Sequence, residues 1–371
     1  VQLTASIEET MNIDIPKIFE AGHWHVIEAD GHDYAKIWEA LAEAQNMDKP
    51  VVIIGDTIMG KGVGIMEPDG ANLVPTWHGK APKPEQADEE LETLVVSDEE
   101  KALIEGFLPL IKWKPNDPNF AEDLSLTEIN GTPINTGTPI VYEPGTVTDC
   151  RGAYGQALLD LAKNNSSVLA LTADLGGSVM TKFVKAEVPA QHIECGIAEQ
   201  HMVSLSGGLS LRGYVPFCST FGAFMSSRAK DQARVNDINQ CNVKMVATHC
   251  GLSVGEDGPT HQAIDDAGSF LGMFHTMVID PADANQTDRI IRYIASHYGN
   301  FYVRMGRHKF PVVLKEDGSL FYDENYEYTY GRCDVVREGA DLTLVAIGSM
   351  VNESLGALEI LKENNPDVRW N

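Results

Sequence analysis

Short apolar runs alternate with longer amphipathic stretches along most of the chain. Residues 51–55, 167–172 and 243–248 are runs of mostly apolar and small side chains, interrupted by Lys244, with the length and composition of strands buried on both faces. Residues 33–45 and 151–162 instead place apolar side chains at helical spacing. Strands and helices in alternation predict an α/β fold with doubly wound, mostly parallel sheets.

The same alternation predicts further elements on both sides of these runs. In the helix at residues 33–45, the side chains of Ile37, Leu41 and Ala44 fall on one face, which we expect to point inward. The other expected strands are residues 24–28, 215–219, 277–280, 301–304 and 342–347, and the other expected helices are residues 197–211, 221–235, 285–296 and 352–361.

Two irregular segments divide the chain. Residues 112–148 are rich in Pro, Asn, Thr and Gly and have little periodicity, and residues 314–340 form a second connector. The chain opens with Val1 inside a patterned segment and ends where a strand would begin, so we expect it to be one piece of a longer chain. The domains predicted from this division are residues 1–111, residues 149–313 and the truncated start of a third at residues 341–371.

The chain is strongly acidic. Its 28 Lys and Arg residues against 54 Asp and Glu residues give a net charge of −26 at pH 7, which argues against nucleic acid and anionic membranes as partners. The six cysteines have no CxxC or metal-ligand spacing and mostly lie in apolar segments, so we expect reduced, buried thiols in a cytoplasmic protein. We expect neither a signal peptide nor a membrane-spanning helix, because no apolar run reaches 18 residues.

The most informative stretch is residues 194–211, with the sequence E-C-G-I-A-E-Q-H-M-V-S-L-S-G-G-L-S-L. Its small and apolar composition is typical of a buried helix, yet it places Glu199 in the first turn. Two interpretations remain open. Glu199 is either an acid that suits the positive end of a helix dipole, or a carboxyl group in a dry site that keeps a proton and donates a hydrogen bond.

Residues 56–79 form a Gly-rich segment that contains the motifs G-K-G-V-G and T-W-H-G. No apolar helix follows the glycines, so the segment lacks the context of a dinucleotide-binding fingerprint. We expect an irregular loop close to a ligand, with backbone amides available to phosphate. His78 is either a packed loop histidine or a ligand-binding one, and the loop alone leaves both interpretations open.

Polar residues follow the ends of the predicted strands within residues 149–313. They are Asp174, His249, Asp257, His261 and Arg307. Ligands of open α/β sheets bind in the crevice outside the carboxyl ends of the strands. We therefore expect these side chains to share one site.

Taken together, these motifs resemble the transketolase family of thiamine diphosphate enzymes, and the resemblance covers nearly the whole chain. It implies the thiamine diphosphate-binding fold, with the C-terminal part of the diphosphate-binding domain, the entire pyrimidine-binding domain and the opening of the C-terminal domain. The family's G-D-G…N element, which holds Mg²⁺ and the diphosphate, would lie before Val1. The matching stretches are D-G-H-D (30–33), G-K-G-V-G through W-H-G (60–79), T-A-D-L-G-G-S (172–178), G-I-A-E-Q-H-M (196–202), S-T-F-G-A-F (219–224), A-T-H-C-G-L-S-V-G-E-D-G-P-T-H-Q (247–262) and V-R-M-G-R (303–307).

The resemblance implies cofactor contacts residue by residue. Glu199 matches the glutamate that binds the aminopyrimidine ring nitrogen and favours the imino tautomer. Phe221 and Phe224 match the aromatic residues around that ring, although their spacing alone would equally fit two core aromatics. Asp174 matches a residue near the cofactor at the subunit interface, and Val1 matches the residue that gives the metal a backbone carbonyl.

It also implies the groups for catalysis and substrate binding. His78, His249 and His261 match histidines that relay protons and donate hydrogen bonds around the diphosphate, the thiazolium and the substrate oxygens. A fork-shaped Arg suits a phosphate dianion and would supply local positive charge. The residues that match substrate-binding positions are Arg151, Ser178, Asp257, His261 and Arg307.

The implied activity is the transfer of a two-carbon ketol unit between sugar phosphates, with thiamine diphosphate and Mg²⁺ (or Ca²⁺), in a homodimer with its active site at the subunit interface. Two alternatives remain open: an enzyme like 1-deoxy-D-xylulose-5-phosphate synthase, and a cofactor-binding or assembly subunit of a split transketolase. The chain reads Thr248-His249-Cys250 where longer transketolases read T-H-D, which leaves the sugars open. Without the G-D-G…N element, we expect the chain alone to be inactive.

Overall fold

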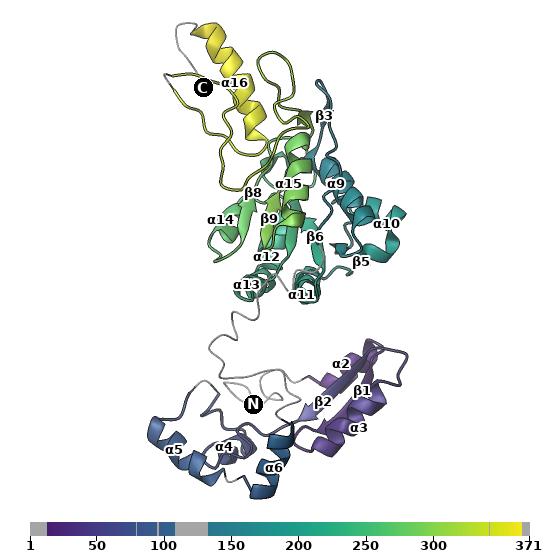
Figure 1. Cartoon of the computed structure of the whole chain (residues 1–371), viewed down its shortest axis with the longest axis vertical. Helices are drawn as coiled ribbons and strands as arrows, with labels where there is room; N and C mark the ends of the chain where they lie inside the picture. The colour runs from purple at the N-terminus through teal and green to yellow at the C-terminus, as the bar shows by residue number, and fades with distance from the viewer. Residues whose placement is uncertain (1–12, 79, 95, 108–132, 341, 366–371) are drawn as a thin grey trace. The chain divides into compact units, whose positions relative to one another are not determined.

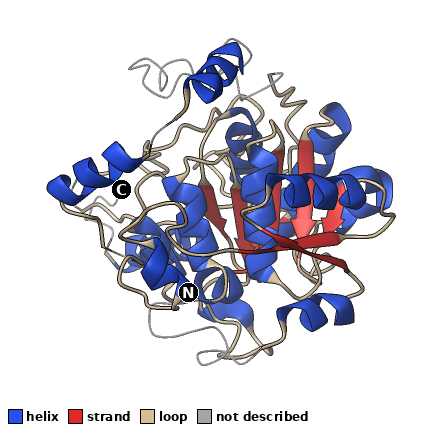
Figure 2. Ribbon diagram, turned by 90° about the horizontal axis from the view of Figure 1, so that it is seen from below, coloured by secondary structure: helices blue, strands red, loops and turns tan. Residues whose placement is uncertain are grey.

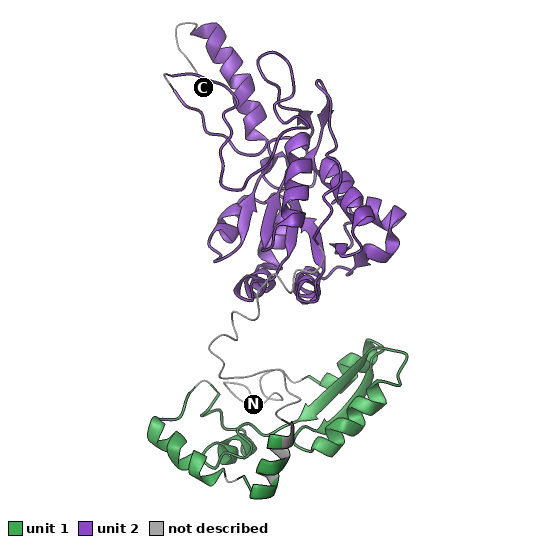
Figure 3. Cartoon of the chain, in the orientation of Figure 1, with its two compact units in different colours: residues 1–115 green, residues 116–371 purple. Residues whose placement is uncertain are grey.

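The computed structural model describes residues 13–78, 80–94, 96–107, 133–340 and 342–365, so Val1 lies outside the described residues. The chain forms two compact units, Val1–Pro115 and Asn116–Asn371 (Figure 3). In the described part of both units, no helix has the length and apolarity needed to cross a membrane.

The first unit is built on two parallel strands, β1 (His25–Asp30) and β2 (Val51–Asp56), joined by the helix α3 (Tyr34–Ala44). The Asp33 carboxylate begins α3 by accepting hydrogen bonds from the backbone of Ala35 and Lys36. The predicted strand–helix–strand order is confirmed. The other helices of this unit are α2 (Ile15–Ala21), α4 (Glu67–Ala71), α5 (Pro84–Thr93) and α6 (Asp98–Phe107).

The inward face of α3 differs from the predicted one. Ala40 is buried and Ile37 and Ala44 are half-buried, but Leu41 is 47% exposed, so its predicted burial is wrong. Trp38 is 73% exposed on the same helix. A two-stranded sheet is too narrow to cover the whole apolar stripe of the helix, which explains the difference.

The second unit contains a six-stranded sheet in the order β5-β4-β6-β7-β9-β8, and every neighbouring pair is parallel (Figures 1 and 2). Helices connect these strands, as the sequence predicts for a doubly wound sheet. The strands are β4 (Val168–Thr172), β5 (His192–Glu194), β6 (Val215–Phe221), β7 (Lys244–Thr248), β8 (Met277–Ile279) and β9 (Phe301–Arg304).

Both faces of this sheet are covered, and the strand residues alternate between two cores. On β4, Val168 and Ala170 belong to the core with α9 (Cys150–Asn164) and α15 (Ala284–Ser296). Leu169 and Leu171 face the other core. That core is shared with α11 (Glu199–Ser210) and α13 (Lys230–Ile238). Burial on both faces explains why the central strands are rich in apolar residues.

The boundaries of several elements differ from the prediction. The expected helix at residues 221–235 is two helices, α12 (Gly222–Ser227) and α13, and β6 continues through Phe221. Residues 342–347 are all described and form no strand: Leu342 makes a single β-bridge, the residues after it are irregular, and Val345 is 91% exposed. The remaining elements are β3 (Val147–Thr148), α10 (Lys182–Glu187), α14 (Asp266–Leu271), β10 (Phe310–Pro311) and α16 (Met350–Asn364), with short 3₁₀ turns at Pro189–Gln191 and Leu252–Val254.

All six cysteines are free thiols, as expected. Four are buried, Cys195 is half-buried and Cys333 is exposed. Burial raises the pKa of Cys218 to about 12, which keeps this thiol protonated and unreactive.

Candidate functional site

The carboxyl ends of four neighbouring strands carry most of the residues that the sequence singles out. Asp174 follows β4, Phe221 ends β6, His249 follows β7 and Arg307 lies three residues beyond β9. β5 pairs with one side of β4 and β6 pairs with the other side. The order in which successive strands are added to the sheet therefore reverses at β4. Such a switch opens a crevice at the carboxyl ends of the strands.

Glu199 is the first residue of α11 and only 3% exposed, so it is at once an acid at the start of a helix and a buried carboxyl group. The sequence did not indicate its partner. The Nη1 atom of Arg228 donates a hydrogen bond of 2.6 Å to Oε1 of Glu199. A buried carboxylate is costly without a paired donor, and Arg228 satisfies that need.

The two predicted aromatic residues lie beside this ion pair. The ring centroids of Phe221 and Phe224 are 5.4 Å apart, and Phe221 is 6% exposed. The guanidinium carbon of Arg228 lies 3.8 Å from the centroid of the Phe224 ring, within the range of a cation–π contact. Arg228 therefore contacts both the carboxyl group and the aromatic surface of the site.

Two of the predicted histidines extend the aromatic cluster. The His249 ring is 4.0 Å from the Phe221 ring, and the His261 ring is 5.4 Å from Phe221 and 5.2 Å from Phe224. Burial, reinforced by the nearby Arg151 charge, lowers the pKa of His249 to about 4. His249 is therefore a neutral imidazole at pH 7.

This burial predicts that His249 makes the fold sensitive to acid. The unfolded chain binds a proton near pH 6.5 but the folded one only near pH 4, so stability falls as the pH drops through this window. His249→Asn removes this titrating imidazole. Between pH 7.5 and pH 4 the variant should therefore lose less of its free energy of unfolding than the wild type does, by up to about 3 kcal/mol. Urea unfolding at several pH values measures it.

The exposed His297 provides the control, and His297→Asn is measured in the same way. Equal acid sensitivity of the wild type and His249→Asn would contradict the assignment of a buried neutral imidazole at this position.

The residues predicted to hold a phosphate are also brought together. Arg151 donates hydrogen bonds of 3.3 Å to the backbone carbonyls of Ser178 and Arg307. An oxygen of Asp257 lies 3.4 Å from Nη1 of Arg307 and 3.8 Å from Nε2 of His249. Ser178 contributes its carbonyl to this contact and not its hydroxyl group.

The two guanidinium groups of this cluster are already paired with acids. Arg151 lies 3.2 Å from Asp149, and Arg307 donates a 2.6 Å hydrogen bond to Glu256. The expected local excess of positive charge is therefore offset by neighbouring carboxylates. A bound phosphate would compete with Glu256, whose side chain is 77% exposed and free to move into solvent.

Asp174 is placed at the same edge of the sheet by its backbone. Its φ angle of 58° is in the left-handed region, and its N–H donates a 2.7 Å hydrogen bond to Oε1 of Glu194. The same oxygen accepts a 3.1 Å hydrogen bond from Gly196. Glu194 thus ties the loop after β4 to the loop that leads into α11 and Glu199.

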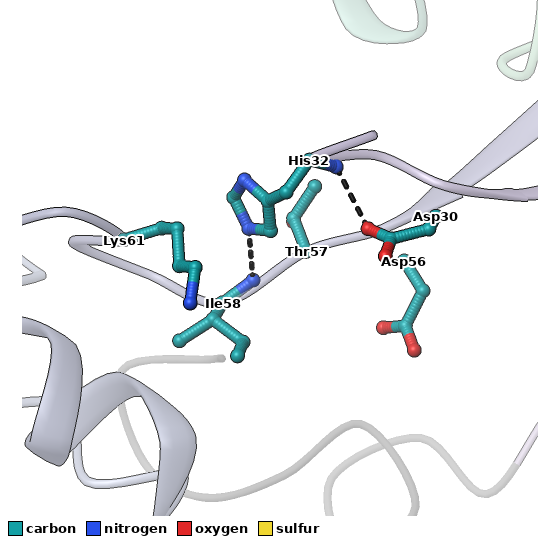
Figure 4. Close-up of a pocket in the computed structure, with 6 residues that line it drawn as sticks. All are labelled: Asp30, His32, Asp56, Thr57, Ile58 and Lys61. Carbon is teal, nitrogen blue, oxygen red and sulfur yellow. Dashed lines mark hydrogen bonds between the residues drawn. The ribbon is translucent and has the colours of Figure 1, made fainter. Parts of the chain in front are cut away.

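The first unit has a pocket of its own, of about 350 Å³, at the carboxyl ends of β1 and β2. Nε2 of His32 accepts a 2.7 Å hydrogen bond from the Ile58 backbone (Figure 4). His78 is exposed in the segment between α4 and α5. The sequence predicts a ligand near the G-K-G-V-G loop and includes Asp30, His32 and Lys61 in the matching stretches, but it assigns no role to the side chains of this pocket. The pocket is lined by Asp30, His32, Asp56, Thr57, Ile58 and Lys61.

Three domains of one family match the chain in order. They are the transketolase thiamine diphosphate binding domain at residues 1–89, the pyrimidine binding domain at residues 147–312 and the C-terminal domain at residues 331–369. A solved split-gene transketolase is 34% identical, with 71% of its length covered. The chain belongs to the transketolase family.

Known transketolases match the chain along nearly all of its length. Human transketolase is 31% identical over 368 residues, which are 98% of this chain and 54% of the human protein. Rat transketolase is 32% identical over 94% of this chain and 52% of its own length. The chain therefore spans about half the length of the curated transketolases that it matches.

Solved transketolases confirm the α/β fold. The split-gene transketolase, described as an inactive β4 tetramer, aligns over 61% of this chain with a TM-score of 0.53. The transketolase of Campylobacter jejuni aligns with the whole of this chain, with a TM-score of 0.70 and 24% identity. The alignment covers 59% of the Campylobacter protein. The transketolase of Pichia stipitis in complex with sedoheptulose-7-phosphate has the same TM-score at 23% identity.

Proposed function

We propose that this chain supplies the pyrimidine half-site and the substrate-phosphate contacts of a transketolase that moves a two-carbon ketol unit between sugar phosphates. The observation that carries the proposal is a continuous series of side-chain contacts at the carboxyl ends of the parallel strands. It runs from Glu199 through the aromatic pair and His249 to Arg307. A carboxyl group, a flat aromatic surface and two guanidinium groups in one crevice suit a charged heterocycle next to a sugar phosphate.

The residues present fit the aminopyrimidine of thiamine diphosphate. The face of Phe224 and the carboxyl group of Glu199 already accept a planar N–H donor, the Arg228 guanidinium. Glu199 would bind the ring nitrogen, and Phe221 and Phe224 would fix the plane of the ring. When bound, the cofactor supplies the electron sink of the reaction.

The substrate end of the site follows from the other contacts. His249 is neutral at pH 7, so one of its ring nitrogens donates and the other accepts a hydrogen bond. His261 and Asp257 would bind substrate hydroxyl groups, while Arg151 and Arg307 with Ser178 would hold the phosphate. His249 itself is only 3% exposed, so its ring is largely shielded from solvent.

The diphosphate and its metal belong to the other half-site in this proposal. His78 would face the diphosphate, the carbonyl of Val1 would bind Mg²⁺ (or Ca²⁺), and Asp174 would lie near the cofactor at the interface of a cytoplasmic homodimer. Among the residues that the structure describes, no group of three His, Cys, Asp or Glu side chains is placed to hold a metal. The domain boundaries at residues 111, 149, 313 and 341 remain part of the proposal.

A second candidate is that the chain is one subunit of a split transketolase. The similarity to a split-gene transketolase and the coverage of about half of the curated transketolases favour it. In that case this chain alone lacks turnover, and a second polypeptide restores it. We keep the deoxyxylulose phosphate synthase activity as the competing outcome of the assay.

The assay compares xylulose phosphate plus ribose phosphate with pyruvate plus glyceraldehyde phosphate, both with thiamine diphosphate and Mg²⁺. We expect no turnover by the 371-residue chain alone and ketol transfer once the preceding part of the diphosphate-binding domain is supplied. Turnover with pyruvate but not with xylulose phosphate would overturn the proposed activity. Activity of the isolated chain would overturn the proposed division of the site.

A further inference from the structure

Arg228 holds two groups of the site at once. It follows the last residue of α12, one helical turn after Phe224. Its guanidinium lies 3.8 Å from the Phe224 centroid and donates a 2.6 Å hydrogen bond to Glu199. The Arg228 side chain is 44% exposed, whereas the Glu199 side chain is only 4% exposed. One partner is therefore fixed in the protein, and the other reaches in from solvent.

The chemistry of this contact matches that of the proposed ligand. A guanidinium is flat, stacks on aromatic faces and presents N–H donors in its plane. An aminopyrimidine ring is also flat and also carries an N–H donor beside a ring nitrogen. We propose that Arg228 occupies the place of the aminopyrimidine in the cofactor-free chain, and that it must leave Glu199 and Phe224 when the cofactor binds.

This inference rests on the proposed cofactor site and adds to it a residue that sets cofactor affinity. A buried carboxylate that loses its paired cation is strongly destabilised, so Arg228 stabilises the chain while the cofactor is absent. The cofactor must break the ion pair and the cation–π contact before it binds. Its apparent affinity is reduced by the population of the paired state.

The Arg228 side chain is suited to leave. It is long, and 44% of it is already exposed. A rotation that moves the guanidinium fully into water therefore needs no change in the backbone and leaves the group well solvated. The acid that stays behind is in the first turn of α11 and cannot follow it. Cofactor and Arg228 therefore compete for one position, and binding of one excludes the other.

The test is Arg228→Ala, which should lower the free energy of unfolding and at the same time raise the affinity for the cofactor. Because the buried Glu199 loses its partner, the free energy of unfolding should fall. Because the competitor is gone, thiamine diphosphate with Mg²⁺ should bind about tenfold more tightly, as expected for a partly exposed ion pair plus a cation–π contact. Thiamine without the diphosphate should show the same gain. Isothermal titration calorimetry of the chain completed with the preceding part of the diphosphate-binding domain measures the affinity, and urea unfolding of the 371-residue chain measures the stability.

Three variants test the specificity of the effect. Arg228→Lys keeps the charge but loses the flat fork, so its affinity should lie between those of the wild type and Arg228→Ala. Arg234→Ala removes an exposed arginine from α13 and should change neither quantity. In a Glu199→Gln background the charge of the ion pair is gone and only the hydrogen bond and the Phe224 contact hold Arg228, so Arg228→Ala should raise affinity by less than it does in the wild-type background.

The outcomes separate the inference from the proposed function. If the wild type binds thiamine diphosphate and Arg228→Ala binds equally or more weakly, Arg228 is no competitor and the inference is wrong while the cofactor site stands. If neither the wild type nor Arg228→Ala binds thiamine diphosphate or thiamine, the pyrimidine site itself is wrong and the inference falls with it. Tighter binding with lower stability supports both.

Discussion

Glu199→Gln is expected to fold like the wild type and to lose about 10²- to 10⁴-fold of the turnover of the complete enzyme. The amide keeps the shape of the side chain and can still accept a hydrogen bond from Arg228, so the buried position stays filled. It cannot hold or release a carboxyl proton, which is the role proposed for Glu199 toward the pyrimidine ring. The loss should therefore appear in turnover and in exchange of the cofactor C2 proton, with an unchanged circular dichroism spectrum.

Another acid at the start of a helix offers a matched control. Asp231 lies in the first turn of α13, as Glu199 does in α11, but it is exposed. Both acids suit the positive end of a helix dipole, so Asp231→Asn should keep wild-type turnover and C2-proton exchange. Normal exchange in Glu199→Gln would refute the proposed role of this carboxyl group. An unfolded Glu199→Gln would instead mean that the contact with Arg228 is mainly structural.

Much of the second unit could be predicted from local patterns. β9 (Phe301–Arg304) has the predicted bounds, and the helix α9 buries Ala153, Leu158 and Leu161 as expected. Strands buried on both faces are continuous apolar runs, which makes them easy to detect. Because the carboxyl ends of parallel strands lie on the same side of a sheet, Asp174, His249 and Arg307 could be predicted to lie near one another. This prediction needs no knowledge of side-chain contacts.

The pairing of charged side chains could not be predicted in this way. Arg228 and Glu199 are 29 residues apart, and Arg307 and Glu256 are 51 apart. No periodic pattern in the sequence indicates either pair, because each depends on how two distant segments pack together in the folded chain. Short elements such as β5 were missed for a related reason: three residues between two loops carry too little pattern to be recognised.

The sequence T-H-C in place of T-H-D acquires a structural explanation. Cys250 is 4% exposed and packs where a Cβ atom on Gly222 would lie 2.4 Å from its sulfur. Gly222 begins α12 directly beneath the aromatic pair, so the close approach needs both a glycine and a compact thiol. Cys250 is therefore a buried residue that packs against the start of α12.

A buried ion pair stabilises the same layer. Asp266 is fully buried and accepts hydrogen bonds of 2.8 Å from the Arg304 side chain and from the Tyr302 hydroxyl group. Burial opposes ionisation of Asp266, but the Arg304 charge outweighs it and lowers the pKa of this carboxyl group. Its contribution to stability is therefore present at neutral pH and is lost as the pH falls through that lowered pKa.

Asp266→Asn is expected to lower the free energy of unfolding at pH 7 by about 3 kcal/mol, because it leaves the partly buried Arg304 with one carboxylate fewer. Asp280, which also pairs with Arg304, keeps the loss from being larger. The exposed neighbour Asp265 is the control, and Asp265→Asn should cost less than about 0.5 kcal/mol. Urea unfolding compares the two variants. Equal stability of both would mean that the Asp266–Arg304 pair contributes no net energy and that packing alone holds the layer beneath the site.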